Sequence, residues 1–155
     1  MAAEYVYNEQ QLVAFGSNVL LLDSIPCRRG CVMHENGTGI LTLRGPVFDG
    51  RNFNAKAQYK VTGNMNIAIP TGQTVGAISV AIAQNGEEIP TSKAISTPGA
   101  VEEFQQVSID KIVTVSVGCC NTIAIENVLP GIDPATEIGG AILVRNVNLT
   151  VARIA

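Results

Sequence analysis

The chain has 155 residues and a mass of 16.3 kDa, which is enough for one domain that closes its own hydrophobic core without a metal or disulfide scaffold. Only 15% of its residues are charged, against about 25% in an average soluble domain, so we expect copies of the chain to cover part of its surface. Its net charge of -3 and the lack of any Lys or Arg cluster longer than the pair Arg28-Arg29 argue against nucleic acid as a partner.

The N-terminal segment, residues 1–11, has neither a basic region nor an apolar run long enough for a secretory signal. The apolar run at residues 19–22 has only about a fifth of the length that a bilayer crossing requires. We therefore expect synthesis in a cytoplasm and no membrane partner. We also expect a separate N-terminal arm at residues 1–11, followed by one domain at residues 12–155.

Five later segments have the alternation of apolar and polar residues that is typical of β-strands. Residues 57–69 alternate strictly, which predicts a strand with one buried and one wet face. Residues 75–83 carry no charge on either face, so we expect that strand to be covered on both sides. Residues 107–117 and 121–127 predict two more strands. Residues 141–154 predict a long last strand whose phase changes, and a β-bulge would resolve that change.

Turn residues separate these segments. Asn85-Gly86 lies between an apolar run and Glu87, which is the strongest short signal for a β-hairpin because a type I′ turn needs two positive φ angles. Residues 36–39 form a similar turn signal between residues 31–34 and 40–43. No alternation of strands with helices is present, so the sequence predicts an all-β fold, a single jelly-roll β-sandwich.

Residues for catalysis are scarce. His34 is the only histidine, so one chain cannot build a metal site from several imidazoles, and no nucleophile-elbow pattern is present. The adjacent pairs Glu87-Glu88 and Glu102-Glu103 would diverge on a strand, which does not favour paired acid and base chemistry. We therefore expect no enzymatic activity, no catalytic residues and no cofactor.

The cysteines form the one cluster that could bind a metal. Cys27, Cys31 and His34 are spaced C-x3-C-x2-H, and Cys119-Cys120 could add a fourth ligand. That spacing differs from the tight C-x2-C turn of a zinc knuckle. Small buried thiols are the interpretation we favour, while structural zinc and a disulfide stay open.

Asparagines recur on two of the expected strand faces. Asn64 and Asn66 lie on one, and Asn146 and Asn148 lie on the last strand. Side-chain amides bind sugars, but such sites usually also contain aromatic platforms, and this chain has no Trp and three Tyr. We therefore favour contact with water or with a neighbouring subunit.

Several short motifs carry a resemblance to a known group of proteins. They are residues 25–34, residues 36–45, Asn85-Gly86-Glu87, and residues 115–120 with the strand that closes the chain. In these motifs the chain resembles small structural proteins of tailed bacteriophages and prophages of Gram-positive bacteria. Its strand layout is similar to the tumour-necrosis-factor-like, or complement-head, jelly roll.

The resemblance implies a homotrimer and a role in the virion, after synthesis in the cytoplasm of the host bacterium. The implied function is decoration or stabilisation of the capsid, or a place in a head fibre, with the major capsid protein or another shell protein as partner. The alternative is a receptor- or carbohydrate-binding tip of a phage fibre or a bacterial surface appendage. A collagen-like stalk often precedes such jelly rolls and is absent here, so we expect attachment through the domain itself or its first dozen residues.

Two sets of residues are the candidates for these contacts. An obligate interface is as apolar as a domain core, so a strand that is apolar on both faces predicts a subunit interface formed by its small residues, Ala77, Ser79, Ala81 and Ala83. Aromatic side chains on a polar arm are good anchors. We therefore expect shell attachment through Tyr5, Val6, Tyr7 and Phe15.

Overall fold

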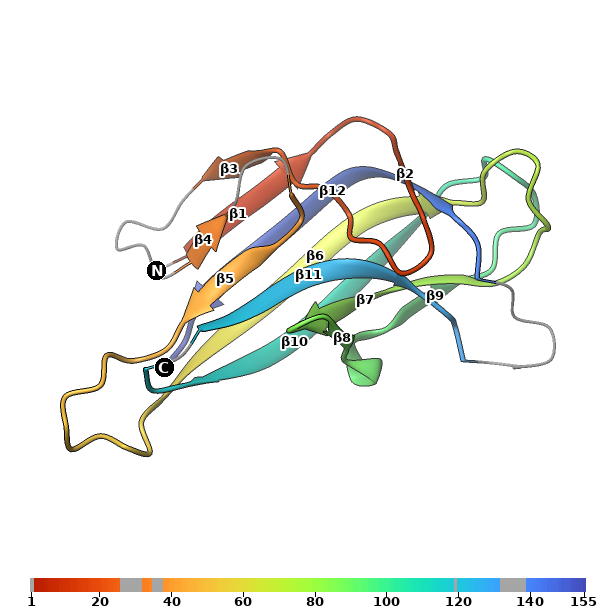
Figure 1. Cartoon of the computed structure of the whole chain (residues 1–155). Helices are drawn as coiled ribbons and strands as arrows, with labels where there is room; N and C mark the ends of the chain where they lie inside the picture. Colours follow the sequence, from red (N-terminus) through yellow and green to blue (C-terminus); the bar gives the residue numbers. More distant parts are fainter. Residues whose placement is uncertain (1, 26–31, 35–37, 119, 132–138) are drawn as a thin grey trace.

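The computed structural model describes residues 2–25, 32–34, 38–118, 120–131 and 139–155, which form two antiparallel β-sheets packed face to face (Figure 1). These residues include no α-helix and only a single turn of 3-10 helix, η1 (Pro90–Ser92). The prediction of an all-β sandwich is confirmed.

The first sheet, sheet A, has the order β10 (Gln105–Ser116), β6 (Lys56–Ala68), β12 (Ile142–Arg153), β1 (Ala2–Tyr7) and β3 (Asp23–Ile25), with β2 (Gln11–Val13) paired to β12 beyond β1. Sheet B has the order β4 (Val32–His34), β5 (Leu41–Arg44), β11 (Cys120–Val128), β7 (Ile78–Gln84) and β8 (Glu87–Glu88), with β9 (Ala94–Ser96) also paired to β7. The chain crosses repeatedly between the sheets, as a jelly roll requires.

The main predicted strands are present. Residues 57–69 correspond to β6, and the segment 75–83 corresponds to β7, which begins three residues later than predicted. The hairpin between β7 and β8 turns at Asn85 and Gly86, whose φ angles are 54° and 85°. Two positive φ angles are the signature of the predicted type I′ turn.

The predicted bulge lies in β12. The register of β12 against β6 shifts between Arg145 and Asn148, and Asn146 has a φ of 54°. The extra residue places Arg145 on the outer face of sheet A while Val147 and Leu149 enter the core. The bulge shifts the alternation by one residue. It therefore explains why, under a strict two-residue period, an arginine and apolar residues seem to share one face of this strand.

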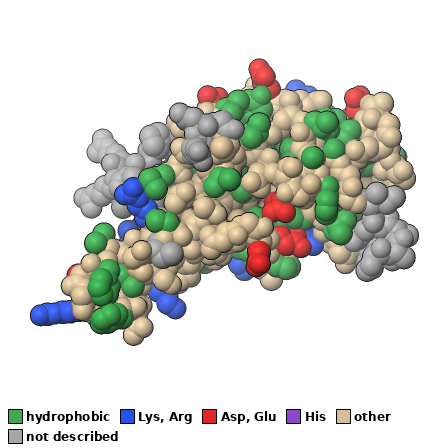
Figure 2. Space-filling view, viewed as in Figure 1, with side chains coloured by type: hydrophobic (Ala, Val, Ile, Leu, Met, Phe, Trp, Pro, Cys, Tyr) green, Lys and Arg blue, Asp and Glu red, His purple; other side chains and the backbone are tan. Residues whose placement is uncertain are grey.

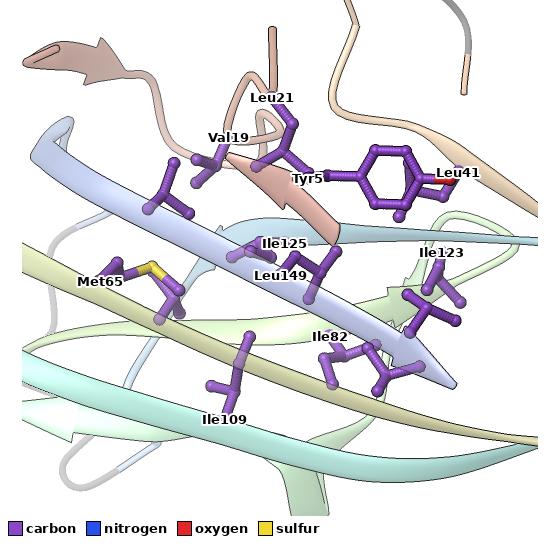
Figure 3. Packing of buried hydrophobic residues seen from close by; sticks show 14 of the residues in the cluster. Tyr5, Val19, Leu21, Leu41, Met65, Ile82, Ile109, Ile123, Ile125 and Leu149 are labelled. Atoms are coloured by element: carbon purple, nitrogen blue, oxygen red, sulfur yellow. The ribbon is translucent and has the colours of Figure 1, made fainter. Parts of the chain in front are cut away.

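The core lies between the two sheets (Figure 3). Tyr5, Met65, Ile109 and Leu149 enter it from sheet A, while sheet B contributes side chains such as Ile125. All five are at most 2% exposed. Apolar side chains of this size contribute about 1.5–3 kcal/mol each when fully buried, so this layer is the main source of stability.

Residues 1–11 do not form a separate arm, which corrects the predicted domain boundary. Residues 2–7 are β1, paired with β12 along six residues and with β3 along three. The alternation here is weak, because the inward side chains are Ala3, Tyr5 and Tyr7 and the first of them is small. The short apolar pattern therefore does not stand out in the sequence, although the strand lies inside sheet A between β12 and β3.

Candidate interaction surfaces

The chain has a large surface for its mass. Its accessible area is 8146 Å², whereas a compact monomer of this mass exposes about 7,500 Å². Figure 2 shows charged side chains in scattered positions and hydrophobic side chains gathered on the loop that projects at the lower left.

A network of side-chain amides occupies the outer face of sheet A. Asn64 pairs with Asn148 across β6 and β12, and Asn66 contacts Asn146 of the bulge, so the four asparagines noted in the sequence lie together. The network consists of these hydrogen bonds: Ser108 Oγ to Asn64 Oδ1 (2.6 Å), Asn66 Nδ2 to Asn146 Oδ1 (3.4 Å), Asn146 Nδ2 to Asn8 Oδ1 (2.5 Å) and Asn148 Nδ2 to Glu4 Oε1 (2.6 Å).

The arrangement of this network favours protein contact over sugar binding. Asn64, Asn66 and Asn148 are half-buried, and each amide bonds to a neighbouring side chain that holds it in place. The aromatic ring of Phe104 is covered by the guanidinium of Arg145, whose Cζ lies 5.5 Å from the ring centroid. Between Arg145 and the Lys60–Asp110 ion pair (3.1 Å), β6, β10 and β12 present only uncharged side chains on this face. A broad, nearly uncharged β-surface of this kind suits contact with another protein.

The small residues of β7 lie on the outer face of sheet B. Ser79, Ala81 and Ala83 are at most 2% exposed and alternate with core residues, and Ser79 Oγ donates to the Val128 carbonyl at 2.7 Å. Ala77 lies just before β7, at one end of the sandwich. Both faces of β7 are buried, as expected, but the groups that bury them belong to the same chain. A neighbouring subunit is not needed to explain it, and the interface role of these four residues stays a prediction.

Glu126 of β11 lies opposite Ala81 on this face. Burial, and secondarily the charge of Glu88, raises the pKa of the Glu126 carboxyl above its ordinary value. A raised folded-state pKa means that the ionised form is penalised in the folded protein. The penalty is fully present at neutral pH and disappears as the pH falls below the ordinary value.

Glu126→Gln is therefore expected to raise the melting temperature at neutral pH, and the gain should vanish at about pH 3, below the ordinary pKa, where both states hold the proton. Thermal unfolding followed by circular dichroism at the two pH values measures this. The exposed Glu87→Gln is the matched control and should change little at either pH. A gain from Glu126→Gln that is equally large in acid would contradict the assignment.

The four predicted attachment residues do not form one patch. Tyr5 is 1% exposed in the core, and Tyr7 packs against the core with its hydroxyl 3.5 Å from Glu9 Oε2. Val6 is opposite Asn148 on the outer face of sheet A, and Phe15 is 47% exposed at the end of the sandwich. Tyr5 is excluded as a contact because it is buried. Attachment to a shell through the other three stays a prediction.

A projecting segment that the sequence analysis did not identify is the 45–55 loop, which connects β5 to β6 (Figure 1). Val47, Phe48 and Phe53 are 86%, 49% and 70% exposed, and the two phenyl rings pack edge to face with centroids 5.1 Å apart. Exposed apolar groups in contact on a soluble domain mark interaction sites. The only sign of this site in the sequence is that two phenylalanines lie in a turn-rich segment outside the predicted strands.

Hydrogen bonds within the 45–55 loop fix its shape. Asp49 Oδ1 accepts from the backbone N–H of Arg51 (2.9 Å) and of Asn52 (3.1 Å), and Asn52 Nδ2 donates to the Val47 carbonyl (2.8 Å). At its base, the Gly118 N–H donates to the Pro46 carbonyl at 2.9 Å. The exposed rings are therefore displayed by an ordered loop.

At the other end of the sandwich lies a second feature, the end pocket, with a volume of about 250 Å³. It opens where β6 and β11 end and β7 and β12 begin. Its walls mix apolar side chains with backbone groups and two side-chain amides, and they include Phe15, Ile69, Gln73, Val75, Ala77, Ile78, Asn127, Leu129 and Ile142.

The residues of the possible metal site are only partly described. Cys27, Cys31 and Cys119 lie outside the described residues, so the zinc and disulfide alternatives stay open. Cys120 begins β11 and is exposed, and His34 Nε2 hydrogen-bonds with the Thr38 carbonyl at 2.8 Å. Within the described ranges, no three His, Cys, Asp or Glu side chains are grouped so that they could hold a metal ion. None of the helical structure in the described chain has the length and hydrophobicity of a membrane span.

Comparison with known proteins identifies the fold. No family model matches the sequence, and no curated protein matches it. Among solved structures, Eiger TNF from S. frugiperda matches with a TM-score of 0.65 at 10% identity, over 100% of this chain and 92% of that one. The globular domain of zebrafish complement 1qA protein matches with a TM-score of 0.55 at 8% identity, over 99% of this chain and 97% of that one.

These likenesses show that the chain is a jelly roll of the tumour-necrosis-factor and complement C1q type. The predicted strand layout is thus confirmed. At 8–10% identity the likeness shows the fold alone.

Proposed function

We propose that the protein is a non-enzymatic structural component of a tailed-phage virion, a homotrimer that decorates or stabilises the capsid or forms part of a head fibre. It is made in the cytoplasm of the host bacterium, and its partner is the major capsid protein or another shell protein. The fold supports a trimeric jelly-roll protein. The structural role in a virion rests on the sequence resemblance.

One observation carries the assembly part of this proposal, namely the uncharged stretch of the outer face of sheet A between Arg145 and the Lys60–Asp110 ion pair. Strands β6, β10 and β12 have 13, 12 and 12 residues, so this face is broad. A closed three-fold ring needs two different surfaces on each chain, and this face is the candidate for one of them. Stable obligate interfaces bury about 2,000 Å² or more, and a broad β-face can supply such an area.

Light scattering is expected to give a mass near three times 16.3 kDa at micromolar concentration. Asn64→Lys should lower this mass, because it places an unpaired charge in the middle of the proposed interface. Thr42→Lys on the outer face of sheet B is the matched control and should leave the mass unchanged. A clean monomer for the unmodified protein would refute the trimer.

The virion role has its own test. Antibody labelling of purified particles should locate the protein on the shell or on a fibre, and cross-linking should join it to the major shell protein. Particles without the protein would refute the role even if the trimer forms. Specific glycan binding by the isolated trimer would instead favour a receptor-binding tip.

A further inference from the structure

The 45–55 loop and the end pocket lie at opposite ends of the molecule. The loop precedes β6, and Ile69 of the pocket follows it, so the 13 residues of this strand separate them by roughly 40 Å. Hydrogen bonds fix the loop to its own end of the sandwich. Within one chain the two features cannot meet, whereas two copies arranged end to end can bring them together.

The two features match in size. The loop displays two phenyl rings and one valine side chain, with Phe53 as the more exposed ring. The pocket holds about 250 Å³, and an apolar cavity of about 150 Å³ is enough to bind a benzene molecule. One phenyl ring of the loop therefore fits between walls such as Val75, Ile78 and Leu129.

The charges at the two ends are also complementary. Around the loop, Arg44, Arg51 and Lys56 are exposed, and Asp49 is the single carboxylate among them. Asp49 Oδ1 is already bonded to two backbone N–H groups of the loop.

Beside the pocket, the exposed carboxylates are those of Glu102 and Glu103. The backbone N–H of Glu102 donates to the carbonyl of Ile69, a pocket residue, at 2.8 Å. The cations nearest to them in sequence, Lys93 and Lys111, are paired with Glu88 and Thr91. Arg145 of β12 is stacked on Phe104. A basic loop end thus faces an acidic pocket end when copies follow one another in the same direction.

We propose that the 45–55 loop of one copy inserts into the end pocket of the next, so that copies assemble head to tail. The interface is heterologous, with a different surface on each partner, and it leaves a free loop at one end and a free pocket at the other. Such a contact extends into a linear array. It does not depend on the trimer, because the repeating unit can be one chain or three.

Sedimentation velocity across a range of protein concentrations tests the proposal. Above the micromolar concentrations at which light scattering should give the basic unit, the unmodified protein is expected to form larger species, and added salt should reduce them. Phe53→Ser removes the more exposed ring, and Ala77→Phe fills the pocket, so each variant should show only the basic unit. Phe53 is 70% exposed, so its replacement should leave the fold intact, and circular dichroism checks this for both variants.

Mixing the two variants gives a sharper result. The loop of Ala77→Phe is intact and the pocket of Phe53→Ser is intact, so the mixture should form pairs of units and nothing longer. A trimeric basic unit without pairing would overturn the end-to-end contact and leave the trimer standing. Larger species that persist in Phe53→Ser would overturn it too.

A lipid surface is the competing occupant of the loop. In a co-sedimentation assay, the protein should not pellet with vesicles of phosphatidylcholine and phosphatidylserine if the loop binds the pocket of a second copy. Binding to these vesicles that Phe53→Ser abolishes and Ala77→Phe leaves unchanged would assign the loop to a membrane and overturn the proposal.

Discussion

Replacing Tyr5 by alanine is expected to lower the free energy of unfolding by about 3–5 kcal/mol, the range seen for large aromatic residues removed from a core. The side chain is 1% exposed in the core layer, and its ring lies 5.2 Å from that of His34. Domains of this kind are stable by only about 5–15 kcal/mol, so the variant should be close to unfolding. Chemical denaturation with urea, followed by circular dichroism, measures the change.

Val6→Ala is the matched control, because Val6 lies on the same strand but points to the outer face of sheet A. It should cost less than about 1 kcal/mol, as expected for partly exposed positions outside the core. Deletion of residues 2–7 should be worse than either substitution, because it exposes the edge of β12 as well as the core. Equal, small effects of Tyr5→Ala and Val6→Ala would contradict the placement of β1 in the sandwich and restore the N-terminal arm.

The sequence predicts the long strands because their information is local. Strict alternation in residues 57–69, the Asn85-Gly86 turn and the phase change in β12 each depend on neighbouring residues, and all three are confirmed. The position of β1 is set by its pairing with residues 147–152, which lie far away in the chain. A six-residue strand whose inward side chains are one alanine and two tyrosines has too little alternation to be recognised alone.

The candidate surfaces were predictable only in part. Clustered asparagines are visible in the sequence, but their common face depends on the register of β12 against β6. The absence of charge on both faces of β7 is also visible, but groups of the same chain cover its outer face. Exposure of Phe48 and Phe53 could not be predicted, because a phenylalanine in a loop gives the same pattern whether it folds back onto the core or projects from it.

Asn127 shows most clearly how a long-range role stays hidden. In the sequence it is the polar last residue of the predicted strand 121–127, in phase with Ile123 and Ile125, and no neighbouring residue shows what its amide would bond to. In the structure it is 2% exposed, and its Nδ2 donates to the carbonyls of Val13 at 3.1 Å and Gly140 at 2.8 Å. Its backbone N–H also donates to the Ser17 carbonyl at 3.1 Å. One side chain thus joins β11 to β2 and to the start of β12.

Asn127→Ala is therefore expected to destabilise the protein by roughly 2–6 kcal/mol, because two carbonyls lose this donor at about 1–3 kcal/mol each. Asn127→Asp should be worse at neutral pH, since an ionised carboxylate cannot donate and faces two carbonyl oxygens. Its deficit should shrink in acid, where the protonated carboxyl can donate to one of them. Urea denaturation at neutral and acid pH measures both variants.

Asn121→Ala provides the control for these two variants, because Asn121 lies on the same strand and its Nδ2 bonds with the Thr114 carbonyl at an exposed position, 3.3 Å away. That replacement should cost about 0.5 kcal/mol or less. If Asn127→Ala and Asn121→Ala cost the same, the buried amide is not what connects the two sheets at this end of the sandwich. If the deficit of Asn127→Asp is the same at both pH values, the donor role of the amide is wrong, and only the volume of the side chain matters.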